Sequence, residues 1–155
     1  MMISTKGRYA MRLMIDVAAN EKDGPVPLRE IAHREDMPIK YLEQLVRLLT
    51  QNGLLCSVRG QRGGYLLARK AADISAGDIL RCVEGTVAPV SCLAEPDTCP
   101  RKNTCTTLSF WKGLDAVIDS YIDSVTLAQL CEPCANDTWR ADYANPNKVA
   151  QTIST

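Results

Sequence analysis

Three cysteines lie close together in the segment CLAEPDTCPRKNTC, at positions Cys92, Cys99 and Cys105. The segment also holds two prolines, an aspartate and an asparagine, which disfavour helix and strand interiors, so we expect a loop. Thiolates are soft ligands suited to iron–sulfur clusters, zinc or copper(I). The gaps of six and five residues exceed the roughly two to four that are usual in structural zinc sites. The spacing favours an iron–sulfur cluster, with zinc or metal-free redox thiols as alternatives.

A second pair of thiols, Cys131 and Cys134, forms a CxxC motif further along the chain. These two cysteines are candidates for a fourth metal ligand. A CxxC can also be a redox pair, but no βαβ pattern surrounds this one and no histidine lies near it to act as a base. We therefore do not expect an enzyme. Cys56 and Cys82, by contrast, fall in a predicted strand and a predicted helix, where we expect buried thiols that act as small apolar side chains.

Length and composition describe one globular domain with an appendage. The chain has 155 residues, of which 46% are apolar and 23% charged. The apolar run near the N-terminus is interrupted by Arg12 and Asp16, so we expect neither a signal peptide nor a membrane span. The expected location is the cytoplasm. In a reducing compartment, an odd count of seven cysteines indicates a metal or redox site rather than a disulfide framework.

Charge is distributed unevenly although the formal net charge is zero. Residues 1–80 contain twelve Lys and Arg against nine Asp and Glu, while residues 81–155 contain six against nine. The basic excess therefore lies in the N-terminal half. It is too small to identify a partner without local sequence patterns.

The first half of the chain predicts three helices and a β-hairpin. An amphipathic helix starts at Ser4, a short one follows Pro27, and a third runs roughly from Pro38 to Asn52. The turn between the second and third helices is so short that they must cross steeply, which predicts a helix-turn-helix over about residues 28–51. After Gly53, the text LLCSVRGQRGGYLLA predicts two short strands with a glycine-rich turn, a wing over about residues 54–68.

This order of elements is that of a winged helix-turn-helix that reads DNA. With the apolar stripe of the third helix turned inward, several polar side chains remain outside, and two wing arginines flank glycines. The alternative is an ordinary solvated helix face beside a glycine-rich hairpin. The candidate DNA-binding residues are Lys40, Tyr41, Glu43, Gln44, Arg47, Arg59 and Arg62.

The second half predicts a fourth helix over about residues 75–84, a cysteine loop over residues 86–106 and a long amphipathic helix over residues 107–130. We expect the long helix to form a homodimer, because two half-sites give a small DNA reader the affinity that one lacks; the alternative is packing within its own domain. Residues 131–155 predict a poorly ordered tail. The expected fold is mainly α with a small β-hairpin, a winged helix-turn-helix over residues 1–85 followed by the dimerisation helix.

Several segments together resemble one family: STKGRYA near the start, YLEQL in the third helix, VRGQRGGYLL in the wing and the three spaced cysteines. The chain is similar to IscR/NsrR-type regulators of the Rrf-two family over about Met2 to Leu130. The resemblance implies a homodimeric bacterial transcription factor on double-stranded, palindromic DNA. It also implies an iron–sulfur cluster of two or four irons, held by Cys92, Cys99 and Cys105, that senses iron–sulfur status, nitric oxide or redox state.

The chain departs from this family at the fourth cluster ligand. IscR-like members have a histidine three residues after the last cysteine, where this chain has Leu108. NsrR-like members use a carboxylate near the N-terminus of the other subunit, where this chain has Arg8. His33 is the single histidine and is expected at the surface. The fourth ligand is therefore Cys131, Cys134 or an external group such as water or a small thiol.

Overall fold

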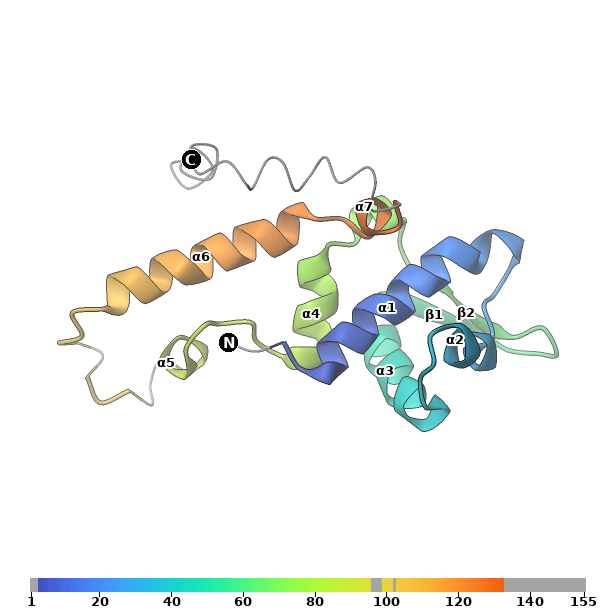
Figure 1. The fold of residues 1–155 in the computed structure, drawn as a ribbon, viewed down its shortest axis with the longest axis horizontal. Helices are drawn as coiled ribbons and strands as arrows, with labels where there is room; N and C mark the ends of the chain where they lie inside the picture. Colours follow the sequence, from blue (N-terminus) through green and yellow to red (C-terminus); the bar gives the residue numbers. More distant parts are fainter. Residues whose placement is uncertain (1–2, 96–98, 102, 133–155) are drawn as a thin grey trace.

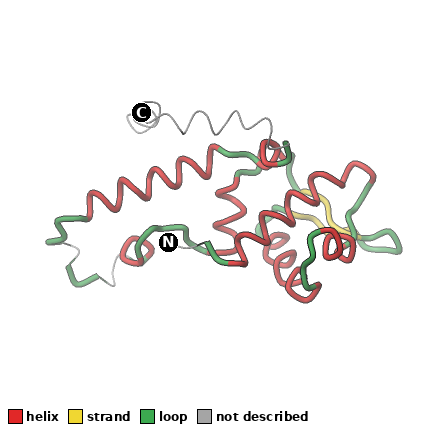
Figure 2. Tube along the Cα trace, viewed as in Figure 1, coloured by secondary structure: helices red, strands yellow, loops and turns green. Residues whose placement is uncertain are grey.

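The computed structural model describes residues 3–95, 99–101 and 103–132. A winged-helix body occupies one side and an arm formed by α5, the cysteine loop and α6 extends from it (Figure 1; Figure 2). The predicted fold class is confirmed: the chain is mostly helical, with one antiparallel hairpin. The elements run in the order α1 (Thr5–Asn20), η1 (Glu21–Asp23), α2 (Leu28–Arg34), α3 (Ile39–Gln51), β1 (Leu55–Val58), β2 (Gly64–Leu67), η2 (Ala71–Asp73), α4 (Ala76–Glu84), α5 (Ser91–Ala94), α6 (Leu108–Ser124) and α7 (Leu127–Leu130).

A short turn, residues 35–38, connects α2 to α3. Asp36 adopts a left-handed conformation with φ of 49°, which aspartate tolerates better than most residues. Met37, next to it, is buried, and its N–H donates to the carbonyl of Ala32 at 3.0 Å. The turn therefore continues the hydrophobic core instead of looping away from it. Figure 1 shows α2 and α3 packed beneath α1.

One core joins the helices of the winged-helix body. Its members come from the apolar stripes of α1 and α3, from the start of β1 and from α4. The largest fully buried side chains include Leu13, Met14, Ile31, Leu42, Leu45, Leu49, Leu54, Leu55, Ile74, Ile79 and Leu127. Burying apolar groups of this size is the main force that holds the elements together.

A buried carboxylate connects α1 to α2. The side chain of Asp16 is 4% exposed, and both of its oxygens accept hydrogen bonds from the Arg34 guanidinium at 2.8 Å. The hydrogen bonds that Arg34 donates to Asp16 raise the pKa of Arg34 above its ordinary value. Paired bonds of this fork geometry fix orientation as well as distance. These bonds help to fix the angle between α1 and α2. The position of α3 depends on that angle, because α3 follows α2 after a short turn.

The N-terminus of α1 is capped by a residue that is distant in the sequence. Glu84, at the end of α4, accepts three hydrogen bonds with one carboxylate oxygen, from the Ser4 N–H at 3.1 Å, the Ser4 hydroxyl at 2.7 Å and the Gly7 N–H at 3.0 Å. A carboxylate is favourable there because the first amide groups of a helix are unpaired and carry partial positive charge. Gly7 is buried in the same contact.

The long helix predicted over residues 107–130 is interrupted in the structure. α6 ends at Ser124, Val125 is extended, and α7 starts after Thr126. The break is caused by contacts with the residues before and at the start of α4: Val125 O accepts from the Ala76 N–H at 2.8 Å, and the Leu127 N–H donates to Ile74 O at 2.8 Å. Among the described residues, no helix has the length and apolar character that crossing a membrane requires.

We expect Gly7→Ala to destabilise the protein by about 1–3 kcal/mol, because the added methyl group overpacks a tight contact. An added Cβ would lie 2.5 Å from Glu84 Oε1 and 2.8 Å from Ile3 Cγ2. Urea denaturation measures the change in the free energy of unfolding. Arg8→Ala is the control, since Arg8 is exposed in the same helical turn and its loss should change stability by about 0.5 kcal/mol or less. Equal stabilities for the two variants would contradict the tight packing at Gly7.

Candidate DNA-binding surface and cysteine loop

The outer face of α3 presents a row of polar side chains to solvent. Lys40, Glu43, Gln44 and Arg47 are all exposed, while the opposite face of the helix carries buried Leu42, Leu45, Val46 and Leu49. The row offers an ammonium, a guanidinium and an amide that can donate to phosphates or base edges. The structure thus places four of the five predicted α3 residues where a bound duplex could reach them.

Tyr41 is placed differently from its neighbours. It is half-buried, and its ring meets the ring of Tyr9 edge to face, with centroids 5.5 Å apart and an interplanar angle of 86°. Arg12 lies over the Tyr9 ring at 5.7 Å and pairs with Glu35 at 2.7 Å. The Tyr41 ring is therefore used in packing the start of α3 against α1. Edge-to-face pairs of this kind are favourable beyond their buried area.

The tip of the wing carries the two predicted arginines, Arg59 and Arg62, and both are exposed. Between them, Gly60 adopts a φ of 120°, a conformation that favours glycine. Gln61 at the tip is also exposed but is not among the residues predicted above. Its position between two glycine-flanked arginines is the sequence signal that could have identified it. The wing tip thus presents two cations and an amide.

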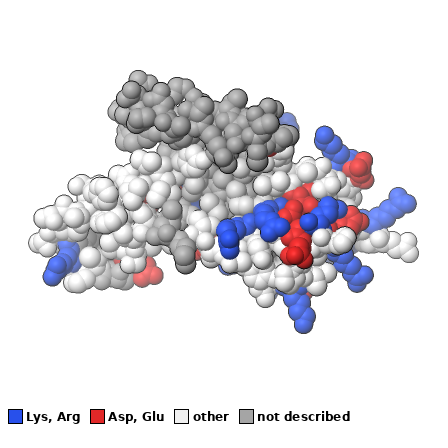
Figure 3. Space-filling model, viewed as in Figure 1, with Lys and Arg blue, Asp and Glu red and all other residues white. Residues whose placement is uncertain are grey.

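A groove of about 290 Å³ separates α3 from the wing. Both elements that are predicted to read DNA line this groove. The lining residues are Glu43, Val46, Arg47, Thr50 and Gln51 of α3 and Ser57 and Tyr65 of the wing. The two candidate DNA-binding elements therefore border one continuous surface. Figure 3 shows Lys and Arg side chains interspersed with Asp and Glu over the winged-helix body, whereas the visible face of the arm carries few charged side chains.

The cysteine loop holds its three thiols in two places. Cys92 lies in the short helix α5, whereas Cys99 and Cys105 lie in the segment that leads to α6. All three residues are half-buried. Within the described part of the chain, no three His, Cys, Asp or Glu side chains converge as a metal site would require. The structure brings the thiols into one loop without placing them around a common point.

Cys105 lies beside a hydroxyl group that can form a hydrogen bond with its sulfur. Its Sγ lies 3.5 Å from the Thr107 hydroxyl. Hydrogen bonding from the Thr107 side chain, with smaller contributions from backbone amides and Arg101, lowers the pKa of the Cys105 thiol. Thiolate is the form that binds metals and that reacts with electrophiles.

The other cysteines lie apart from this loop. Cys131 follows α7, at the far end of α6 from Cys105, and the 17 residues of α6 alone span about 25 Å. Cys134 lies outside the described residues, as does most of the segment predicted to be a poorly ordered tail. Cys82 is half-buried, and burial raises its pKa. The expectation of a buried Cys56 is wrong: it is exposed, because only the first residue of β1 turns into the core.

In metal-free protein, we expect Thr107→Val to slow alkylation of Cys105 at neutral pH. Removing the hydroxyl takes away the main cause of the lowered pKa, so the pKa rises and the thiolate fraction at neutral pH falls. Alkylation followed by peptide mass spectrometry over a pH series measures this, and the midpoint should move to higher pH. Thr107→Ser keeps a hydroxyl and serves as the control. A Thr107→Val profile that coincides with wild type would show that the hydroxyl does not stabilise the thiolate.

Comparison with known proteins agrees with the fold. The family model Rrf2, described as an iron-dependent transcriptional regulator, matches residues 3–133. The HTH-type transcriptional regulator IscR of Yersinia pseudotuberculosis is 42% identical over 130 residues, which are 84% of this chain and 79% of that protein.

Two solved structures have the same architecture. CymR, titled the global cysteine regulator of B. subtilis, superposes with a TM-score of 0.69 at 38% identity, covering 84% of this chain and 96% of that one. IscR of T. potens superposes with a TM-score of 0.69 at 36% identity, covering 94% and 91%. These relatives are regulators, which confirms the expectation that the chain is not an enzyme. The chain belongs to the Rrf2 family of transcriptional regulators.

Proposed function

We propose that this protein is a homodimeric, cytoplasmic transcriptional regulator whose affinity for palindromic operators is set by an iron–sulfur cluster in the cysteine loop. The signal is iron–sulfur status, nitric oxide or redox state. One observation carries the proposal: α4 joins the winged-helix body, with its exposed α3 and wing residues, directly to a loop that holds three thiols.

Support for DNA binding comes from the chemistry of the exposed side chains. Arg59 and Arg62 can neutralise phosphates or enter a minor groove, and Gln44 can donate and accept at a base edge. Glu43 is a carboxylate in the same row and either accepts from a cytosine amine or repels phosphate. Because it can reject as well as accept, Glu43 is the residue of this surface best suited to discriminate between operators.

Support for the cluster comes from the kind of donors and from their environment. Cys92, Cys99 and Cys105 are soft ligands in a region rich in prolines and turns, and Cys105 is predisposed to the thiolate form. When bound, the cluster would supply a redox-active, nitric-oxide-reactive group. Neither Leu108 nor Arg8 can complete its coordination, and Cys131 lies at the far end of α6 from Cys105, which leaves Cys134 or an external ligand.

Support for a homodimer comes from the surface of α6. Ile122 is the one buried residue of this helix, whereas Phe110 is 63% exposed and Leu114 is 36% exposed. The Phe110 and Trp111 rings contact each other edge to face at 4.9 Å, so they form one apolar area at the start of the helix. Contiguous exposed apolar surface of this kind marks an interaction site, and a second copy of the chain is the partner proposed here.

A second candidate is a regulator of the same fold that uses zinc or metal-free redox thiols. Two observations favour its metal-free form: the described thiols do not converge on one point, and one similar structure, at 40% identity and a TM-score of 0.66, is titled the oxidized form of Staphylococcus aureus CymR. Metal content separates this candidate from the cluster.

For DNA binding, we expect the two kinds of contact to respond differently to mutation. Arg59→Ala or Arg62→Ala should lower the slope of log affinity against log salt by about one unit, since each removes one phosphate contact. Gln44→Ala should relax sequence preference at a cost of about 1–3 kcal/mol. Titrations on matched and scrambled palindromes measure both effects. Lys112→Ala removes a cation from α6 and should leave slope and preference unchanged; salt slopes unaltered in both arginine variants would remove the wing from the interface.

For the cluster, we expect anaerobically purified protein to be brown, with thiolate-to-iron absorption bands, and Cys92→Ala, Cys99→Ala or Cys105→Ala to lose the iron. Metal analysis and the visible spectrum provide the readout. Cys56→Ala, which removes an exposed thiol from the wing, should keep full iron content. A colourless protein with stoichiometric zinc, or one without metal, would favour the second candidate instead.

A further inference from the structure

The wing strand β2 pairs with β1 along one edge and has a second hydrogen-bonded neighbour along its other, outer edge. The Tyr65 N–H donates to Val26 O at 2.9 Å, and the Val26 N–H donates to Tyr65 O at 2.9 Å. Val26 belongs to the connection between α1 and α2. A one-residue antiparallel bridge therefore attaches the wing to the helix-turn-helix.

The next outward amide of β2 is held by a side chain. N–H groups two residues apart in a strand point to the same edge, so Leu67 presents its amide on the same side as Tyr65. Its acceptor is Glu21 Oε2 at 2.8 Å. Hydrogen bonds to a charged acceptor are stronger than neutral ones, and an amide left unpaired here would be costly. The carboxylate of Glu21 thus extends the bridge at Val26 by one more hydrogen bond.

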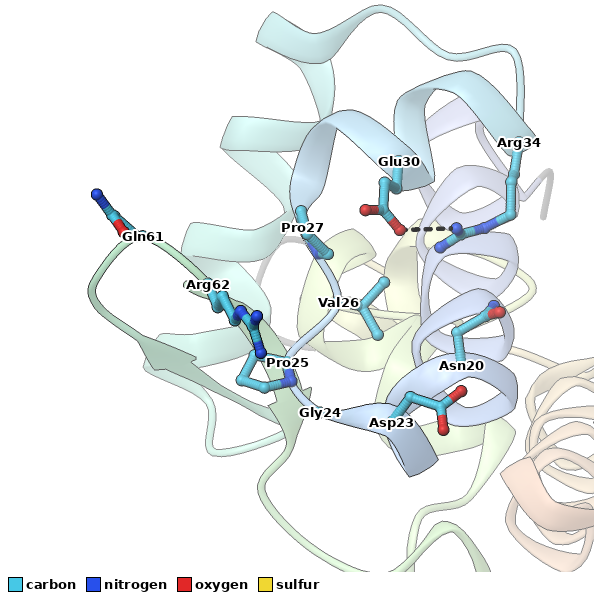
Figure 4. A pocket seen from close by; sticks show the side chains of 10 residues that line it. All are labelled: Asn20, Asp23, Gly24, Pro25, Val26, Pro27, Glu30, Arg34, Gln61 and Arg62. Atoms are coloured by element: carbon cyan, nitrogen blue, oxygen red, sulfur yellow. Dashed lines mark hydrogen bonds and ion pairs between the residues drawn. The ribbon is translucent and has the colours of Figure 1, made fainter.

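The wing is held at its base and stands free at its tip. Gly64 lets the base approach closely, since a Cβ there would lie 2.5 Å from Val26 C and 2.9 Å from Pro27 N. Towards the tip, a pocket of about 480 Å³ opens between Gln61 and Arg62 on the wing side and the α1–α2 connection with Arg34 on the other (Figure 4). The hydrogen bonds of Glu21 and Val26, named the wing anchor from here on, therefore control the direction of the tip.

We propose that Glu21 is a positioning residue for DNA binding, which aims Arg59 and Arg62 by fixing the base of the wing against the helix-turn-helix. This inference rests on the proposed contacts of those two arginines with DNA. Glu21 lies at the start of η1, outside the wing and outside α3. Its effect on DNA would pass through the Leu67 amide, and a small rotation at the base would displace the guanidinium groups at the tip.

The direction in which a Glu21 substitution changes the affinity for DNA distinguishes this positioning role from a simple effect of charge. Glu21 is an anion in a body that must approach polyanionic DNA, so removing its charge alone would tighten binding. Loss of the wing anchor would weaken binding, because the two arginines would no longer be held at the spacing of the groove. Asp23, in the same η1 helix, is an exposed carboxylate and provides a charge-matched control.

The experiment measures DNA affinity over a salt series for Glu21→Ala, Glu21→Gln and Asp23→Ala, with thermal unfolding as the folding check. Glu21→Ala should bind about tenfold more weakly and with a salt slope lower by about one to two units. Glu21→Gln keeps an oxygen that can accept from Leu67 and should recover most of the affinity. Asp23→Ala should bind as wild type or slightly more tightly.

A double-mutant cycle then localises the effect to the wing. Arg62→Ala should cost much less affinity in the Glu21→Ala protein than in wild type, whereas Gln44→Ala should cost the same in both. If Glu21→Ala prevents folding, Glu21→Asp takes its place: it keeps the charge but is one methylene shorter, and it should lose affinity in the same way.

The outcomes are distinct. Binding by Glu21→Ala that equals or exceeds that of Asp23→Ala, or full additivity with Arg62→Ala, would overturn the positioning role. If Arg59→Ala and Arg62→Ala change nothing in the wild-type protein, the proposed wing contacts themselves are wrong, whatever Glu21→Ala does.

Discussion

The arrangement of this protein depends on α4, which packs into the core of the winged-helix body and makes polar contacts with both the body and the arm in its C-terminal half. Glu84 accepts three hydrogen bonds from the first turn of α1. One turn earlier, Arg81 pairs with Asp119 at 3.0 Å and with Asp123, both on α6. Gly77 lies directly against the Asp123 carboxylate, where any side chain would collide. α4 is thus fastened to the winged-helix body by one carboxylate and to the arm by one guanidinium.

These contacts lie directly before the cysteine loop. The cysteine loop begins just after Glu84, so a change in the loop acts on a helix end that also closes α1. Leu80 and Val87 pack with Ile122 in a small apolar cluster at the same junction. Packed junctions tend to switch between discrete arrangements instead of deforming continuously. In the proposed dimer, we therefore expect ordering of the loop around a bound group to reposition the winged-helix body relative to α6, and with it the spacing of the two DNA-reading surfaces.

The sequence predicted the local features well and the long-range ones poorly. The helical spacing of apolar residues and the short turn after the second helix were sufficient to predict the helix-turn-helix. The paired glycines were sufficient to predict the wing. The break of the long helix at Val125 could not be predicted, because its cause is hydrogen bonding to residues about fifty positions earlier. The same holds for Glu21, whose partner Leu67 is 46 residues away, and for the closure of α1 by Glu84. Periodicity reports which face is buried, not which polar groups meet across the fold.

In the candidate site, too, local features could be predicted from the sequence, whereas contacts between elements could not. The exposed row on α3 followed from turning its apolar stripe inward, yet Tyr41 belongs partly to the packing because Tyr9 lies opposite it. The three thiols were identified by spacing alone, whereas the stabilised thiolate of Cys105 depends on a hydroxyl two residues later. Contacts between side chains that are close in the sequence can be predicted only when the backbone conformation between them is known.

We propose that the state of the cysteine loop controls how the protein binds DNA. This control is tested most directly by measuring, at one fixed salt concentration, the affinity of the same wild-type protein before and after anaerobic reconstitution with iron and sulfide, on palindromes of varied half-site spacing. We expect the affinity for at least one spacing to change by about 5- to 150-fold, the usual range of allosteric coupling. Identical affinities at every spacing, with the cluster shown to be present, would contradict it.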